Sequence, residues 1–359
     1  GIRLMAIIDK PTDYFNTVLY SGTDSAQAVT GVGFQPDWTW IKCRSHGGSA
    51  SFEHILTDAV RGVNKTLVSN DTDAETTDNA TGYLNIFGSD GFTTASGGTS
   101  IDAVGGAGRT YASWNWKAGT SFTNDASGTG IGSIDSAGSF NNDSGFSIVS
   151  YTGTGSNGTI KHGLNTAPSM IIFKNRSSVK GWSVYHKSIG ATKFLFLNET
   201  SAEQTYTPMF NNTEPTSSVF SVGTDLATNV SGNNYIAYCF AEKQGYSKFG
   251  SYTGNGNADG TFVYTGFKPA FILWKKSSAS GTNWSIFDNK RDTYNATNHY
   301  LLPNLSNAEG TSDSCDLLSN GFKWRSTDGG SNASGASFIY MAFAENPFVA
   351  SNFNVATAR

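Results

Sequence analysis

Three short stretches decide what this sequence can fold into: GFQPDWTWIK at residues 33–42, LNTAPSMIIFK at residues 164–174 and GFKPAFILWKK at residues 266–276. Each has a turn with a proline, then a run of large apolar residues, then lysine. Proline fixes φ and has no N–H donor, so Pro36, Pro168 and Pro269 belong at the entrances of strands. Each stretch therefore predicts a β-strand that starts just after its proline. The lysine is expected to return the chain to solvent.

The residues around these stretches recur as well. A short strand ending in Tyr-(Ser/Thr)-Gly comes before each, and its tyrosine lies 16 or 17 residues ahead of the proline; these tyrosines are Tyr20, Tyr151 and Tyr252. An aromatic-rich strand closes each copy and contains Trp116, Phe240 or Phe343. Because the last two closing strands are almost wholly apolar or small, we expect them to be covered on both faces, with a buried helix as the alternative.

The middles of the copies share a weaker pattern. HILTD at 54–58, WSVYH at 182–186 and WSIFD at 284–288 alternate polar and apolar residues, which predicts half-exposed strands. Forty-one glycines and 13% aromatic residues fit many short strands joined by turns. We therefore expect an all-β chain of three tandem antiparallel β-sandwiches, of jelly-roll or lectin-like type, with little helix.

The expected boundaries follow from the copies. The sandwiches are placed at residues 13–119, 145–245 and 246–348. Residues 120–144 are rich in glycine, serine and asparagine and are predicted to be a linker or extended arm. Residues 349–359 form a C-terminal tail.

Composition narrows the possible partners. Lysine and arginine total 24 against 28 aspartates and glutamates, giving a net charge of −4. Nucleic-acid binding would need a basic patch, and the sequence contains none, so we do not expect it. No apolar run approaches the roughly 20 residues of a spanning helix, so membrane insertion is not expected either. Three cysteines cannot form a disulfide framework.

The recurring signature resembles repeat-containing virion proteins of marine tailed bacteriophages, of the kind that infect cyanobacteria and related ocean bacteria. The matching segments of the first copy are Gly33-Phe34-Gln35-Pro36-Asp37-Trp38, Asp58-Ala59-Val60-Arg61-Gly62, Ser89-Asp90-Gly91-Phe92 and Trp114-Asn115-Trp116-Lys117-Ala118-Gly119. Residues 235–240 and 342–348 fit the later copies. The resemblance implies a tail-fibre or other appendage protein with a structural or host-recognition role, located in the virion and made in the host cytoplasm. It brings no catalytic residues.

Candidates for catalysis are scattered. The histidines are His46, His54, His162, His186 and His299, and none has zinc-ligand spacing. The run Gly128–Ser133 lacks the strand-to-helix context of a nucleophile or phosphate loop. A glycosidase would need a carboxylate pair, and the candidates by type are Asp58, Glu75, Asp90, Glu199, Glu203, Glu242, Asp288, Glu309 and Glu345. Since no constellation emerges, we predict a protein that is not an enzyme.

Calcium is the one cofactor that the residue types would suit. Asp71 and Asp73 near Asn70, and Asp143 near Asn141, offer clustered oxygen ligands. Turn residues in solvent are the competing explanation, because asparagine and aspartate make turns by themselves.

The eight tryptophans are the most suggestive side chains, because aromatic faces stack on sugar rings and anchor interfaces. Trp38 with Trp40, and Trp114 with Trp116, alternate with small or polar residues and so point to one face of their strands, which we expect to be the core. A sugar site is expected instead in variable loops, such as Ser277–Asn283 or Asn295–Asn298.

Three functions remain. The first is a non-enzymatic virion structural protein that assembles with itself or with other virion proteins. The second is a glycan-binding module that recognises the host surface, with shallow sites multiplied by copy number. The third is a surface-polysaccharide depolymerase.

Overall fold

The computed structural model describes residues 7–45, 52–77, 83–95, 102–351 and 355–357. Within these residues the secondary structure is almost entirely β-strand, which confirms the expected all-β class. The helices there are the single turns η1 (Pro11–Asp13), α1 (Ala126–Thr129) and α2 (Thr207–Phe210). None of these is long or apolar enough to cross a membrane.

The first strand group comprises β1 to β9. Its larger sheet has the order β1-β9-β3-β4-β5-β6, and its smaller sheet has the order β2-β8-β7. The larger sheet consists of β1 (Phe15–Ser21), β3 (Trp38–Cys43), β4 (His54–Asp58), β5 (Lys65–Val68), β6 (Thr76–Thr77) and β9 (Thr110–Trp116). The smaller sheet consists of β2 (Ala28–Thr30), β7 (Leu84–Gly88) and β8 (Gly91–Thr94).

The second strand group comprises β10 to β19. Its larger sheet has the order β10-β11-β12-β19-β14-β15-β16-β17, and its smaller sheet pairs β13 with β18. The larger sheet consists of β10 (Thr120–Asn124), β11 (Ser136–Asn141), β12 (Phe146–Thr152), β14 (Met170–Asn175), β15 (Ser183–His186), β16 (Lys193–Phe196), β17 (Gln204–Thr205) and β19 (Asn234–Phe240). The smaller sheet consists of β13 (Gly158–Lys161) and β18 (Val219–Val222).

The third strand group comprises β20 to β27. Its sheets have the orders β20-β27-β22-β23 and β21-β26-β25-β24. The first of these corresponds to the larger sheets of the other groups and is called the larger sheet below, although both have four strands; it consists of β20 (Ser247–Thr253), β22 (Phe267–Lys276), β23 (Ser285–Asp288) and β27 (Ser337–Pro347). The second consists of β21 (Phe262–Tyr264), β24 (Thr297–Tyr300), β25 (Gly310–Leu318) and β26 (Gly321–Trp324).

The recurring sequence signature falls at corresponding points of the three groups. Trp38 pairs with Trp116, Met170 with Phe240 and Phe271 with Phe343, all in antiparallel register. A proline lies two residues before the first member of each pair. Pro36 and Pro168 precede their strands as predicted, whereas Pro269 lies inside β22 at a register shift. A bulge tolerates proline because the ladder is already interrupted there.

The signature tyrosines also have one role. Tyr20 stacks on Tyr111, Tyr151 on Tyr235 and Tyr252 on Phe338, with ring centroids 5.0, 5.1 and 4.9 Å apart. Their hydroxyls donate to the backbone carbonyls of Val104, Thr228 and Ser331. Each tyrosine therefore fixes the loop that leads into the closing strand of its group.

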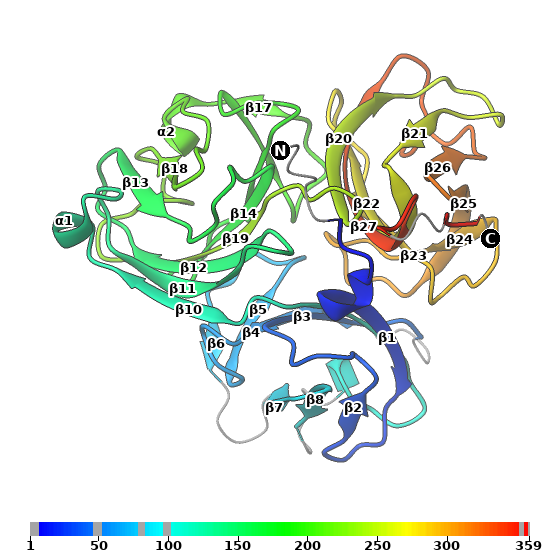
Figure 1. Cartoon of the computed structure of the whole chain (residues 1–359), viewed down its shortest axis with the longest axis horizontal. Coiled ribbons are helices and arrows are strands. Elements are labelled where there is room, and N and C mark those ends of the chain that lie inside the picture. Colours follow the sequence, from blue (N-terminus) through cyan, green and yellow to red (C-terminus); the bar gives the residue numbers. More distant parts are fainter. Residues whose placement is uncertain (1–6, 46–51, 78–82, 96–101, 352–354, 358–359) are drawn as a thin grey trace.

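Each larger sheet is covered on both faces. Neighbouring residues of one strand belong to different apolar clusters, as Trp40 and Ile41 of β3 do, because side chains alternate across a strand. One face packs on the smaller sheet of the same group, and the other faces the other two groups. Figure 1 shows the groups as three lobes about a shared centre, with the larger sheets innermost. The closing strands are accordingly buried on both sides, as expected.

An aromatic triangle occupies the shared centre. The rings of Trp116, Phe240 and Phe343 contact one another edge to face, with centroids 6.3 Å (Trp116–Phe240), 5.7 Å (Trp116–Phe343) and 6.1 Å (Phe240–Phe343) apart. One apolar cluster surrounds the triangle and includes residues from all three groups. Edge-to-face contacts match the positive edge of one ring with the negative face of another.

Corresponding hydrogen bonds join the groups in one cyclic sense. Trp182 of the second group donates its indole N–H to Val68 O of the first over 2.8 Å, and Trp284 of the third donates to Phe196 O of the second over 2.9 Å. In the first group His54 occupies the equivalent position. The backbone N–H of each of these three residues donates to an asparagine side chain of its own group, Asn70, Asn198 or Asn304.

Glutamates continue the same cycle at the rim of each boundary between groups, through their carboxylates at two boundaries and through a backbone N–H at the third. Glu75 of the first group forms two hydrogen bonds, 2.8 and 2.9 Å long, with Arg176 of the second. Glu309 of the third forms two with Arg44 of the first, 3.0 and 2.8 Å long. Between the second and third groups, the backbone N–H of Glu203 donates to Ser277 O. Bidentate arginine–carboxylate pairs of this kind fix orientation as well as contact.

Two expectations about exposure are wrong. The middle strands β4, β15 and β23 are buried throughout and not half-exposed. Lys42, Lys174 and Lys275 do not return the chain to solvent, since all three are fully buried. Both errors have one cause: the face that a single sandwich would leave to water is covered here by a neighbouring group.

The predicted linker at 120–144 is also ordered. It contains β10, α1 and β11, and β10 and β11 extend the second larger sheet. Small residues allow this close approach: a Cβ on Gly138 would lie 1.9 Å from Ile148 O of the neighbouring strand. A composition typical of a linker therefore reflects tight strand packing at this point.

We expect the three groups to unfold together, because they share one core. Phe343→Ala should lower the free energy of unfolding by about 3–5 kcal/mol and shift one cooperative transition, as measured by calorimetry and denaturant titration. Val179→Ala is the control, since Val179 is 59% exposed, and it should change stability by no more than about 0.5 kcal/mol. A second transition that the Phe343 substitution leaves in place would contradict the shared core.

Candidate functional site

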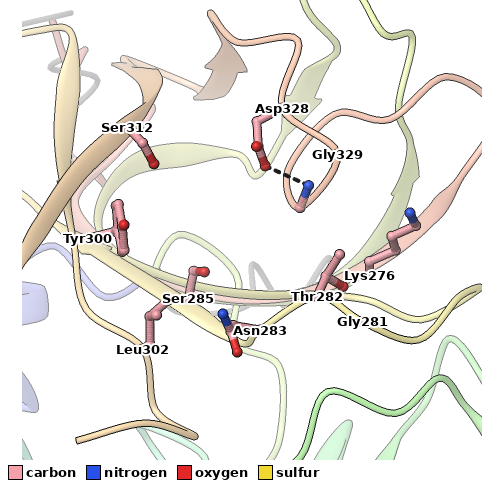
Figure 2. A pocket seen from close by; sticks show the side chains of 11 residues that line it. Lys276, Gly281, Thr282, Asn283, Ser285, Tyr300, Leu302, Ser312, Asp328 and Gly329 are labelled. Atoms are coloured by element: carbon pink, nitrogen blue, oxygen red, sulfur yellow. Dashed lines mark hydrogen bonds between the residues drawn. The ribbon is translucent and has the colours of Figure 1, made fainter. Parts of the chain in front are cut away.

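A polar pocket of about 370 Å³ opens in the third group, bordered by both of its sheets. Figure 2 shows the residues around this space. The lining residues are Lys276, Gly281, Thr282, Asn283, Ser285, Tyr300, Leu302, Ser312, Asp328, Gly329 and Gly330. Hydroxyl, amide and charged groups dominate the lining, so the pocket suits a polar ligand and not an apolar one.

Three hydroxyls of the pocket are available to a ligand. Ser285 begins β23 opposite Trp274, and only 9% of its surface is exposed. Tyr300 ends β24, and Ser312 lies on β25. In the part of the chain that the structure describes, the side-chain oxygens of these three residues have no protein hydrogen-bond partner. Each hydroxyl can both donate and accept.

The loop at 328–332 closes the opposite wall of the pocket. Asp328 accepts hydrogen bonds from the backbone N–H of Gly330 through its side chain, at 2.6 Å, and from that of Asn332 through its carbonyl, at 2.9 Å. Trp274 donates its indole N–H to Gly330 O over 3.1 Å. The wall is thus fastened to β22 from inside the sandwich and does not depend on a ligand for its shape.

The second group has the same loop without the glycines. Asp225 accepts from Ala227 N at 2.7 Å and from Asn229 N at 2.8 Å, which is the hydrogen-bond pattern of Asp328. Leu226 there corresponds to Gly329, which lines the pocket of the third group; Leu226 is 53% exposed and does not fill an equivalent space. The two loops therefore keep the same hydrogen bonds and differ in this side chain. A Cβ built on Gly329 would meet no atom within 4 Å.

The structure tests two expectations from the sequence, one about the loops of a sugar site and one about the tryptophans. Of the two loops proposed for a sugar site, Ser277–Asn283 contributes to the pocket and Asn295–Asn298 does not. All eight tryptophans are almost completely buried, so their assignment to the core is confirmed. Ser285, Tyr300, Ser312 and Asp328 were not predicted from the sequence, because they come together only when β23, β24, β25 and the 328–332 loop assemble.

The histidines in the described residues form hydrogen bonds within and between the strand groups, and His46 lies outside those residues. His162 accepts a hydrogen bond from Leu164 N, and burial lowers its pKa to about 4. His186 accepts from Ser188 N at Nδ1, which leaves Nε2 to donate to Tyr340 O. His54 accepts from the Trp40 indole at Nδ1, and burial holds its pKa well below the usual range.

His54 faces a neighbouring group with its other ring nitrogen. Nε2 has no hydrogen bond of good geometry among the described atoms, yet a backbone interaction with Leu302 of the third group partly offsets the effect of burial on its pKa. His299, 38% exposed, contacts Asp292 on the surface over 2.5 Å. Among the described residues no three histidine, cysteine or acidic side chains are grouped as metal ligands.

Two pairs of candidate carboxylates do meet, each around a buried arginine. Asp58 and Glu75 contact Arg61, and Asp288 and Glu309 contact Arg291. The recurring spacing Asp-x-x-Arg, at 58–61 and 288–291, was the sequence signal for this arrangement. Burial alone would raise the pKa of Asp288, but Arg291 outweighs burial and lowers it.

The same positions supply contacts between groups. Tyr238 of the second group donates its hydroxyl to Asp58 over 2.7 Å, and Trp114 of the first donates its indole N–H to Asp288 over 3.1 Å. In the second group His186 replaces the aspartate and reaches Tyr340 O of the third over 3.1 Å. The three contacts follow the cyclic order of the other joints. Burial lowers the pKa of His186 to about 4, so this contact is made by neutral imidazole.

The buried lysines form a third set of joint contacts. Lys42 donates to Ser306 O at 2.9 Å, Lys174 to Thr72 O at 2.8 Å and Lys275 to Thr200 O at 3.4 Å, each across a boundary between groups. Burial disfavours the charged ammonium and lowers the pKa of each lysine to about 8.

The other predicted sites have structural roles. Asp71 accepts from Thr72 N and Asp73 N, and Asn141 accepts from Asp143 N, so the calcium candidates Asp71, Asp73 and Asp143 lie in turns closed by their own hydrogen bonds. Gly128 N donates to Asp125 at the start of α1, and Ser133 accepts from Thr159 N. Glu242 pairs with Lys187 of its own group and with Lys248 at the start of the third group, and Glu345 pairs with Lys268 within the third group.

A protein family described as a domain of unknown function, DUF7483, matches residues 10–347. No curated protein and no solved structure matches the chain.

Removing the arginine alone should be more harmful than removing the whole buried pair. Arg61→Met leaves Asp58 buried without its counter-charge and should reduce the free energy of unfolding by about 3–5 kcal/mol. Asp58→Asn combined with Arg61→Met should recover much of this loss. Denaturant titration of the two variants tests the prediction, and equal losses would show that the charge is not what matters.

The buried lysines should make stability depend on pH. Between their folded pKa of about 8 and the ordinary value of 10.5, the unfolded chain binds more protons, so stability rises with pH across this window. From about pH 7.5 to about pH 9.5, the wild type should therefore gain about 2 kcal/mol relative to Lys174→Met. Unfolding titrations at both pH values measure the difference. Exposed Lys290→Met is the control and should follow the wild type; a Lys174→Met variant that did the same would contradict the shifted pKa.

Proposed function

The chain belongs to the DUF7483 family of unknown function, and we propose that it is a non-enzymatic structural protein of a phage virion. In this proposal it is a component of a tail fibre or other appendage, assembles with itself or with other virion proteins, and presents loops toward the host surface. The recurring signature that resembles virion appendage proteins supports the assignment.

The observation that carries the proposal is the location of the perturbed ionisable groups. Such groups usually mark active sites. Among the described residues, Arg61, His186, Asp288, Arg291 and the three buried lysines contact a neighbouring strand group, whereas buried His162 bonds within its own group. None of them lines the pocket of the third group. This favours a protein whose buried charges position its parts.

We further propose that the three strand groups are tandem sandwich repeats of one type. They share the order of four strands, β1-β9-β3-β4, β12-β19-β14-β15 and β20-β27-β22-β23, together with the register at Trp116, Phe240 and Phe343 and the tyrosine that fixes a loop. A rigid three-lobed body of this kind suits an appendage, because loops on a fixed scaffold can vary without changing the scaffold.

Glycan recognition at the host surface is the second candidate, and the polar pocket of the third group is the observation that favours it. Multiple copies in a particle would multiply the weak affinity of a single site.

Mass spectrometry of purified particles of the virus that encodes the chain tests the structural proposal. We expect the protein at a copy number similar to that of other appendage components. Its absence from intact particles would overturn the proposal.

A reducing-end assay on host surface polysaccharide tests the non-enzymatic part. The purified protein is expected to release no new reducing ends over the buffer blank. A signal that grows with protein concentration would instead identify a depolymerase.

A further inference from the structure

We infer that the pocket of the third group binds a neutral saccharide unit of a surface glycan. The inference rests on the proposed surface-binding role and names the site and the ligand class for it. The site is formed by Ser285, Tyr300 and Ser312 on one side and by Asp328 and Gly329 on the other (Figure 2).

The lining has the chemistry that sugar hydroxyls require. A sugar hydroxyl donates one hydrogen bond and accepts others, and it is best matched by groups that do the same. Ser285, Tyr300 and Ser312 supply such hydroxyls, and no partner within the described residues occupies them. Ser285 is 9% exposed as a whole residue, and its Oγ is not one of the buried oxygens that lack a partner, so a ligand in the pocket can reach this hydroxyl.

Charge and size restrict the ligand further. Lys276 and Asp328 are the charged residues of the lining, one of each sign, so the pocket has no excess that would select an anion or a cation. A volume of about 370 Å³ lies near the lower end of the range for small-molecule sites and suits one or two sugar rings. The phenol of Tyr300 adds an aromatic surface, on which the apolar face of a sugar can pack.

The pocket exists before the ligand arrives. Trp274 and the backbone of the 328–332 loop hold the wall that carries Asp328, and Tyr252 fixes the same loop through Ser331 O. A preformed site does not spend binding energy on ordering its own loops.

The test uses the full-length protein and four free sugars: glucose, galactose, mannose and N-acetylglucosamine. Saturation-transfer NMR and calorimetric titration should detect at least one of them, with a dissociation constant in the range of about 0.1–10 mM expected for so small a ligand. A glycan array, with the protein multimerised on beads, then shows whether the site prefers a free monosaccharide or a sugar unit within a surface polysaccharide.

Two variants locate the site. Gly329→Leu should weaken binding at least tenfold without unfolding the protein, because the new side chain enters the pocket from a position where a Cβ meets nothing. Ser285→Ala should weaken binding about 3- to 10-fold through one lost hydrogen bond. Leu226→Ala, at the matching position of the second group, is the control and should bind like the wild type.

The outcomes separate the inference from the proposed function. Failure of all four sugars and of the array would overturn the saccharide site, while detection of the protein in virions would leave the structural role standing. Binding that survives in Gly329→Leu, in a variant with wild-type unfolding, would place the sugar elsewhere and would equally overturn the inference.

Discussion

The contact of Trp116, Phe240 and Phe343 at the centre of the molecule is the constraint from which the rest of the structure follows. Each ring comes from the closing strand of a different group, and each touches the other two. For the three rings to meet, all three larger sheets must turn one face inward. That face is then lost to solvent, and every residue on it has to be apolar or has to find a hydrogen-bond partner. The fully buried middle strands are a direct result.

Polar residues at the boundaries between groups add a second constraint, on how the three groups are arranged around the aromatic rings. A buried ion pair adds little net stability when it is complete, but removal of one member is costly because it leaves a charge without a partner. The contacts of Asp58 with Tyr238, His186 with Tyr340 and Asp288 with Trp114 each link one group to the next. Their common direction favours one cyclic arrangement of three similar surfaces, where apolar packing alone would tolerate others. Different residues at equivalent positions, such as His186 in place of an aspartate, further distinguish the joints.

The outer loops of the groups can differ in side chain while keeping the same backbone hydrogen bonds, and the pocket of the third group is an example. The 225–229 and 328–332 loops have the same backbone hydrogen bonds and the same anchoring by a tyrosine. Within that fixed frame the residue after the aspartate changes from Leu226, which is 53% exposed, to Gly329, which lines the pocket. Neither residue belongs to the apolar clusters of the core. Binding and assembly can therefore change separately in this architecture.

The sequence by itself determined the local structure: the strands after Pro36 and Pro168, the all-β class, the burial of every tryptophan and the recurrence of the tyrosine signals. These features depend on nearest neighbours and on the two-residue period of a strand, and both can be read from residue order. Only the tertiary structure decided which strand faces meet another group, and so whether Lys174 is solvated or buried, whether residues 120–144 join a sheet, and where Ser285 and Asp328 approach each other. Those outcomes depend on surfaces brought together from distant parts of the chain. The sequence of one strand does not determine which surface packs on its second face.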